Sequence, residues 1–167
     1  MNNPTFDDVL AGNRRYAHSH HEPGVTGRAA KHLALITCMD SRIDPLAVLG
    51  MQAGDMKILR NAGARVTDDV LRTLVLATYL LDVNRVIVMP HTDCRMAKST
   101  ESEVHQSILD STGVDTRSLE FRTIDDPLAT LRADVQRIRS FPFIPDHVAV
   151  AGAMYDVATG EMHIYDF

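Results

Sequence analysis

The chain has 167 residues, of which 45% are hydrophobic and 23% are charged, and its formal net charge is −5. This length favours one domain, residues 1–167, whose core needs no disulfide or metal merely to hold together. The negative charge argues against nucleic acid or an anionic membrane as a general partner. No apolar run reaches the roughly 20 residues of a membrane helix. The N-terminus lacks a secretory pattern, so we expect a cytoplasmic protein.

The N-terminal segment is predicted to form a helix over residues 5–16, with Thr5 as its N-cap and a partial apolar stripe. The helix is expected to fade into the stretch HSHHEPG, residues 18–24. This stretch is rich in histidine and could touch a metal. We interpret it as a solvated loop, because nothing rigid frames it.

The next part of the chain alternates between strands and helices. A nearly unbroken apolar run over residues 32–38 predicts a strand that is buried on both faces, as in a parallel sheet. Strand, helix and strand in this order predict a right-handed crossover. The further elements are a short helix over 44–50, a strand over 55–60, a helix from Asp68 or Asp69 as cap to about residue 82, and a strand over 85–89.

The C-terminal part predicts two more helices and a hairpin. One helix over residues 101–112 stops at Gly113, and another starts at Asp126-Pro127. Strands over 147–155 and 160–165 are expected to pair as an antiparallel hairpin. The predicted class is therefore α/β: a mostly parallel central sheet with flanking helices and an antiparallel C-terminal edge strand.

Both cysteines of the chain follow predicted strands. Cys38 ends the strand over 32–38, while His91 and Cys94 follow the strand over 85–89. Sites in parallel sheets form beyond the carboxyl ends of the strands, so we expect these three side chains to converge. Two thiolates and one imidazole suit zinc, and three protein ligands with an open fourth position are typical of a catalytic zinc site.

Two charged residues follow Cys38 at a regular spacing. If the chain stays extended, Cys38, Asp40 and Arg42 project to the same side. Asp40 could then compete for the open metal position, and Arg42 could hold its carboxylate away through a bidentate pair. Asp40 would then accept a hydrogen bond from the bound hydroxide and orient it.

Each of these features has a simpler interpretation on its own. A cysteine that ends a strand is usually a small buried hydrophobe, and a surface Asp-x-Arg pair is usually weak. A phosphate-binding cysteine loop fits poorly, because only three residues separate Cys38 from Arg42 and none is glycine. A thiol hydrolase that uses Cys94 and His91 would leave Cys38 unexplained.

The remaining histidines, His105, His147 and His163, have no clear partners in the sequence. We therefore interpret them as surface or structural residues.

The motifs CMDSR at 38–42 and HTDC at 91–94, together with ILRNAGARVTDDVLRTL at 58–74, resemble the β-class carbonic anhydrases, and the resemblance looks closest to short bacterial members. It covers most of the chain. It implies that the protein is a lyase that hydrates carbon dioxide reversibly to bicarbonate and a proton through zinc-bound hydroxide.

The resemblance also implies roles for single residues. Cys38, His91 and Cys94 match the permanent zinc ligands of the family. Asp40 and Arg42 match its catalytic dyad. In the closed form of the family the aspartate becomes the fourth zinc ligand and blocks catalysis, and in the open form it pairs with the arginine.

The family further implies a substrate pocket and an assembly. Gly63 lies where the family lines its pocket. Family members form homodimers or dimers of dimers in which the N-terminal helix, here an arm over about residues 5–17, embraces the partner subunit.

Two departures from the family are visible. Arg95 stands where the family commonly has glycine after the second cysteine, and the chain has no tryptophan, which regulated members use in a noncatalytic bicarbonate pocket. Two alternatives remain open. One is a carbonyl sulfide or carbon disulfide hydrolase with the same zinc site. The other is a non-catalytic module with a permanently closed site of Cys38, Asp40, His91 and Cys94.

Overall fold

The computed structural model describes residues 6–20 and 24–167, built around a five-stranded sheet in the order β2-β1-β3-β4-β5. The first four strands run parallel, and the last pairs antiparallel with β4 at one edge. The predicted α/β class with an antiparallel C-terminal edge strand is thereby confirmed. The strands are β1 (Leu33–Cys38), β2 (Met56–Asn61), β3 (Arg85–Met89), β4 (Ala149–Tyr155) and β5 (Met162–Tyr165).

The central strand β1 is buried over all six of its residues. It lies between β2 and β3, with Cys38 beside Asn61 and Thr37 beside Met89. The Thr37 hydroxyl donates a hydrogen bond of 2.9 Å to the Met89 carbonyl. The segments that leave β2 and β3 therefore both start next to Cys38.

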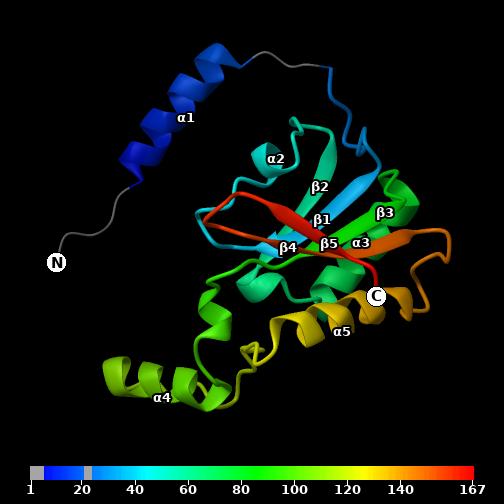
Figure 1. Cartoon of the computed structure of the whole chain (residues 1–167). Helices are drawn as coiled ribbons and strands as arrows, with labels where there is room; N and C mark the ends of the chain where they lie inside the picture. Colours follow the sequence, from blue (N-terminus) through cyan, green and yellow to red (C-terminus); the bar gives the residue numbers. More distant parts are fainter. Residues whose placement is uncertain (1–5, 21–23) are drawn as a thin grey trace.

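Helices cover both faces of this sheet (Figure 1). α3 (Asp68–Leu80) and α5 (Pro127–Arg139) share one hydrophobic cluster with Ala34 and Ile36 of β1. The short α2 (Pro45–Val48) belongs to the opposite side, where its residues pack near Leu33 and Leu35. Successive residues of β1 point to opposite faces, so a run of apolar residues serves both layers.

Local capping explains where most of these helices begin and end. Asp126 caps α5 by accepting hydrogen bonds from two backbone amides, with Pro127 in the first turn, as predicted. Gly113, in a left-handed conformation, ends α4 (Glu101–Thr112), also as predicted. The predicted cap of α3 was wrong: Thr67 is the N-cap and accepts from the Val70 amide, while Asp68 and Asp69 lie in the first turn.

Two helices, α1 (Asp7–Ser19) and α4, stand away from the sheet (Figure 1), and neither has a buried residue among those described. α1 includes residues 18 and 19, so the helix extends into the stretch predicted as a loop. The predicted cap Thr5 lies outside the described residues, as does part of the loop, residues 21–23. None of the described helices combines the length and apolarity that crossing a membrane requires.

The N-terminal half of α4 forms hydrogen bonds with residues 116–123, which follow the helix. His105 Nδ1 lies 2.9 Å from the Thr116 hydroxyl oxygen, a partner that the sequence did not indicate and that agrees with the interpretation of His105 as a surface or structural residue. The Glu101 carboxylate accepts from the Thr123 amide and hydroxyl. These contacts attach the N-terminal half of α4 to the segment that follows the helix.

Candidate metal centre

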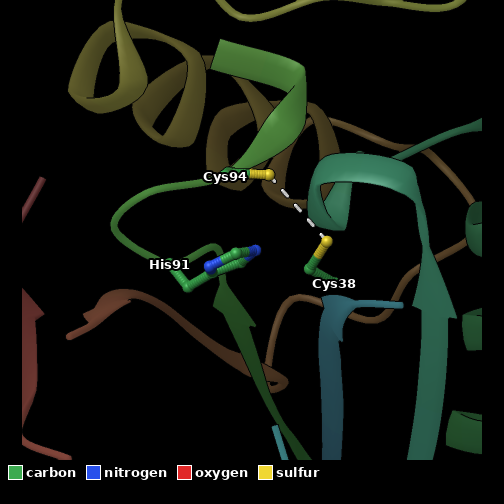
Figure 2. A group of neighbouring side chains, drawn as sticks. All are labelled: Cys38, His91 and Cys94. Atoms are coloured by element: carbon green, nitrogen blue, oxygen red, sulfur yellow. Dashed lines mark hydrogen bonds between the residues drawn. The ribbon is translucent and has the colours of Figure 1, made fainter. Parts of the chain in front are cut away.

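Cys38, His91 and Cys94 converge at the carboxyl ends of β1 and β3 (Figure 2). Their ligand atoms all lie within 4.8 Å of one another, and all three residues are buried. Cys38 is the last residue of β1, and the other two lie just beyond β3, in the loop before the short helix η2 (Arg95–Ala97). The adjacency of β1 and β3 is what brings the three residues together.

The ring of His91 is oriented for metal binding. Nδ1 lies 2.7 Å from the Thr92 carbonyl oxygen and donates to it, which leaves the lone pair on Nε2. Nε2 is the one fully buried side-chain nitrogen or oxygen of the described residues that has no hydrogen-bond partner. A buried acceptor without a partner is unfavourable, whereas a metal-ligating histidine characteristically bonds a carbonyl through its other nitrogen.

The two sulfur atoms are spaced as zinc requires. Cys38 Sγ and Cys94 Sγ are 3.9 Å apart. Zn–S bonds of about 2.3 Å in a tetrahedral arrangement place two sulfurs about 3.8 Å apart. Both cysteines are free thiols. The residues present therefore fit a zinc ion in both geometry and donor type.

Cys38, His91 and Cys94 shift one another's pKa values. The hydrogen bond from Cys94 lowers the pKa of Cys38, and contacts from His91 and the Gly63 amide lower it further. The hydrogen bond to Cys38, followed by burial, raises the pKa of Cys94. The Cys38 sulfur also raises the pKa of His91. The lowered pKa favours a negative charge on the Cys38 sulfur, where a divalent cation would be bound.

Asp40 is engaged by Arg42 in a bidentate ion pair. Arg42 Nη2 lies 2.7 Å from Asp40 Oδ2, and Nε lies 3.0 Å from Oδ1. These hydrogen bonds hold the pKa of Asp40 well below its usual range. Asp40 Oδ2 is 3.7 Å from His91 Nε2, so the carboxylate lies next to the ligands while remaining paired with Arg42.

The local backbone around this pair differs from the expectation of an extended chain. The segment turns at residues 41 and 42, and the Arg42 amide donates to Asp40 Oδ1 at 2.9 Å. An aspartate that accepts from the amide two residues later forms a local turn. The pair therefore arises from a turn rather than from an extended strand.

The turn is fixed by residues that the sequence analysis did not identify. Arg60, on the neighbouring strand β2, donates to the carbonyl oxygens of Cys38 and Asp40 at 2.9 and 2.6 Å. Asp93 accepts from Arg42 at 2.8 Å and pairs with Lys98. Arg60 belongs to the stretch ILRNAGAR, but its role depends on the pairing of β1 with β2, which the sequence does not specify.

Gly63 lies next to Cys38, in the short helix η1 (Ala62–Ala64). Its amide donates to Cys38 Sγ at 3.4 Å. It also lines a small, mainly apolar cavity together with His91, Cys94 and Ile124. The structure thus places Gly63 beside the ligands, and its role in a substrate pocket stays a prediction.

We expect Gly63→Ala to destabilise the fold by about 1–3 kcal/mol, because an L-residue is strained at positive φ and a tight site resists an added methyl group. Gly63 has φ of 79°, and an added Cβ would lie 3.1 Å from Ile124 Cδ1 and 3.2 Å from Met96 Cγ. Denaturant unfolding measures the change. Gly160→Ala is a matched control, because Gly160 also has φ of 79° but has open space around the Cβ position. Equal losses in the two variants would show that crowding at Gly63 contributes nothing.

Comparison with known proteins decides the family. The family model described as carbonic anhydrase matches residues 33–162, which contain β1 to β4 and the cluster of Cys38, His91 and Cys94. The chain belongs to the β-carbonic anhydrase family. Members of this family are zinc enzymes, in agreement with the donor set of Cys38, His91 and Cys94.

Individual members of the family agree with this assignment. The chain is 37% identical over 158 residues to β-carbonic anhydrase 1 of Mycobacterium tuberculosis, which covers 94% of this chain and 95% of that protein. The crystal structure of a carbonic anhydrase from Streptococcus mutans superposes with a TM-score of 0.92 at 34% identity, over 99% and 100% of the two chains. A carbon disulfide hydrolase of Saccharolobus solfataricus is 30% identical, with 79% of this chain and 76% of that protein covered.

The Asp40–Arg42 pair and Arg95 are the two features near the ligands for which the resemblance gave an expectation. Asp40 and Arg42 form the ion pair that the resemblance implies for the open form, and their role as a catalytic dyad stays a prediction. Arg95, which departs from the glycine common in the family, is exposed and donates to the Ser99 hydroxyl at 2.9 Å. It also contributes to an open pocket with Cys38, Asp40 and Arg42.

Proposed function

We propose that the protein hydrates carbon dioxide reversibly to bicarbonate and a proton at a zinc ion held by Cys38, His91 and Cys94. The observation that carries this proposal is the buried, unpartnered His91 Nε2 beside two sulfurs 3.9 Å apart, next to an Asp40 that is paired with Arg42. Zinc, when bound, supplies a Lewis acid that lowers the pKa of a coordinated water and so provides a nucleophile near neutral pH.

The chain's own residues would prepare this reaction. The pairing with Arg42 keeps the Asp40 carboxylate ionised and engaged by the guanidinium while it lies next to the ligands. An ionised carboxylate can only accept hydrogen bonds, so Asp40 would orient the attacking water through its proton. The apolar cavity beside Gly63 suits a small uncharged substrate such as carbon dioxide, and this supports Gly63 as a pocket residue.

Carbon disulfide or carbonyl sulfide hydrolysis is the second candidate. It is favoured by the 30% identity to the carbon disulfide hydrolase of Saccharolobus solfataricus. The identity to β-carbonic anhydrase 1 is higher and extends over more of the chain, so carbon dioxide ranks first. A permanently closed, non-catalytic zinc site is disfavoured, because Arg42 occupies both carboxylate oxygens of Asp40.

Parallel assays of the zinc-loaded protein test this proposal. Stopped-flow mixing with carbon dioxide and a pH indicator measures hydration, and sulfide release is followed with carbonyl sulfide and with carbon disulfide. We expect rapid hydration of carbon dioxide. Sulfide release without hydration above the buffer background would favour the second candidate, and no reaction in any assay would favour the non-catalytic module.

The chain is proposed to act as one domain, residues 1–167, that pairs with a second copy through the arm over about residues 5–17. The apolar side chains Val9, Leu10 and Tyr16 of α1 are between 53% and 63% exposed, although such groups favour burial. A reducing cytoplasm would keep both ligand cysteines as free thiols, and we propose that location.

Val9→Asp is expected to convert the dimer into monomers at micromolar concentration, because it places a charge in the proposed apolar contact. Light scattering coupled to size-exclusion chromatography measures the mass. Arg14→Ala, a change of an exposed polar residue on the same helix, should leave the mass unchanged. A wild-type protein that already elutes at 18.5 kDa would contradict the proposed dimer.

A further inference from the structure

The turn between β2 and α3 contributes a backbone hydrogen bond to the metal centre. The Gly63 amide donates to Cys38 Sγ at 3.4 Å. Both Gly63 and Ala64 have positive φ, at 79° and 58°. For alanine this conformation is unfavourable, so contacts from outside the turn must maintain it.

Asn61 and Arg65 close the turn from its two ends. The Asn61 side chain donates to the Arg65 carbonyl at 2.7 Å and accepts from the Arg65 amide at 2.8 Å. These two bonds fix the separation of residues 61 and 65. Asn61 is also the last residue of β2 and pairs with Cys38, so the N-terminal end of the turn is attached to the sheet.

The Arg65 side chain anchors the other, C-terminal end of the turn. Its Nε donates to Asp134 Oδ2 on α5 at 2.7 Å, and its Nη1 donates to the Arg122 carbonyl at 2.9 Å. The Asp134 side chain is 6% exposed and that of Arg65 is 17% exposed. The turn is thereby attached to a helix whose own apolar face, including Leu131 and Val135, is packed in the core.

A buried ion pair is a poor source of stability, since apolar residues of the same volume usually do as well. The main effect of the Arg65–Asp134 pair is instead to fix the position of the turn relative to α5. Asp134 also lines the same cavity as Gly63, His91 and Cys94, so this end of the pair lies at the cavity beside the ligands. What the pair fixes is therefore the turn that carries the Gly63 amide.

We propose that Arg65 and Asp134 are positioning residues that hold the Gly63 amide against the Cys38 sulfur and thereby set the strength of this sulfur as a metal ligand. The inference rests on the proposed function, in which Cys38 binds zinc. A hydrogen bond to a ligating sulfur draws electron density from it and tunes the metal, and outer partners of this kind also hold the ligand in place.

Cobalt substitution tests the inference without relying on activity. The thiolate-to-cobalt charge-transfer absorption of Asp134→Ala should move to lower energy than in the wild type, because a sulfur that has lost its hydrogen bond gives up electrons more easily. Release of zinc to a chelator should accelerate about 10- to 100-fold. Asp134→Asn keeps an acceptor for Arg65 without the charge, so its shifts in absorption and in zinc release should be smaller. This variant keeps the proposal testable if Asp134→Ala fails to fold.

Val135→Ala is the matched control, because it removes a buried group from the adjacent position of α5 without touching Arg65. Its absorption and zinc release should equal those of the wild type. An unmoved band and unchanged zinc release in both Asp134 variants, or equal shifts in Val135→Ala, would overturn the positioning role. A wild-type cobalt protein without any thiolate band would instead overturn the metal site itself, and the inference with it.

Discussion

Replacing His91 with alanine is expected to remove zinc and carbon dioxide hydration together. Of the three clustered ligand residues that would hold the zinc ion, Cys38 and Cys94 would remain. Loss of an outer hydrogen-bond partner typically weakens metal affinity 10- to 100-fold, so loss of a direct ligand should exceed about 100-fold. Zinc content by elemental analysis and hydration by stopped flow measure the two effects on the same preparation.

The matched control is His163→Ala, which replaces an exposed histidine on β5. This variant should keep about one zinc per chain, the content of a single three-ligand site, and the wild-type rate. If His91→Ala also retained zinc at that level and hydrated carbon dioxide normally, His91 would not be a ligand and the proposed site would be wrong.

Replacing Arg42 with alanine is expected to lower hydration by roughly 100-fold while zinc stays bound, since misplacing a group by about 1 Å can cost that much. Arg42 contacts both oxygens of Asp40 and also Asp93, but it is not among the three clustered ligand residues. Without it, the Asp40 carboxylate is free to turn toward the ligands, because its Oδ2 is already 3.7 Å from His91 Nε2.

Arg72→Ala is the control for this change, because Arg72 forms an exposed pair with Asp69 on α3 that lies outside the site. Such exposed pairs contribute little, so rate and zinc content should match the wild type. Near-normal hydration by Arg42→Ala would remove the proposed function of the pair. Loss of zinc together with activity would show that Arg42 supports the ligands rather than Asp40.

The ligand set could be predicted from the sequence because parallel strands deliver their following residues to one edge of the sheet. Cys38 ends a nearly unbroken apolar run, and His91 and Cys94 follow the apolar run VIVM at 86–89. The adjacency of β1 and β3 then brings the three together. Residue type, strand ends and short spacing were sufficient to predict the cluster that the structure brings together.

The surrounding residues could not be predicted in the same way. Arg65 and Asp134 are separated by 69 residues, and nothing in either local sequence indicates the other. Arg60 acts through the pairing of β2 with β1, which only the tertiary structure establishes. The turn at Ser41 and Arg42 was missed because the spacing of charges suits an extended chain equally well.

X-ray absorption at the zinc edge tests the central claim most directly, because it reports the ligands themselves in the purified wild-type protein. A site of Cys38, His91 and Cys94, with Asp40 held by Arg42, predicts two sulfur neighbours at about 2.3 Å and one imidazole nitrogen at about 2.0–2.1 Å, with a single further oxygen. Zinc surrounded by nitrogen and oxygen alone would contradict the claim.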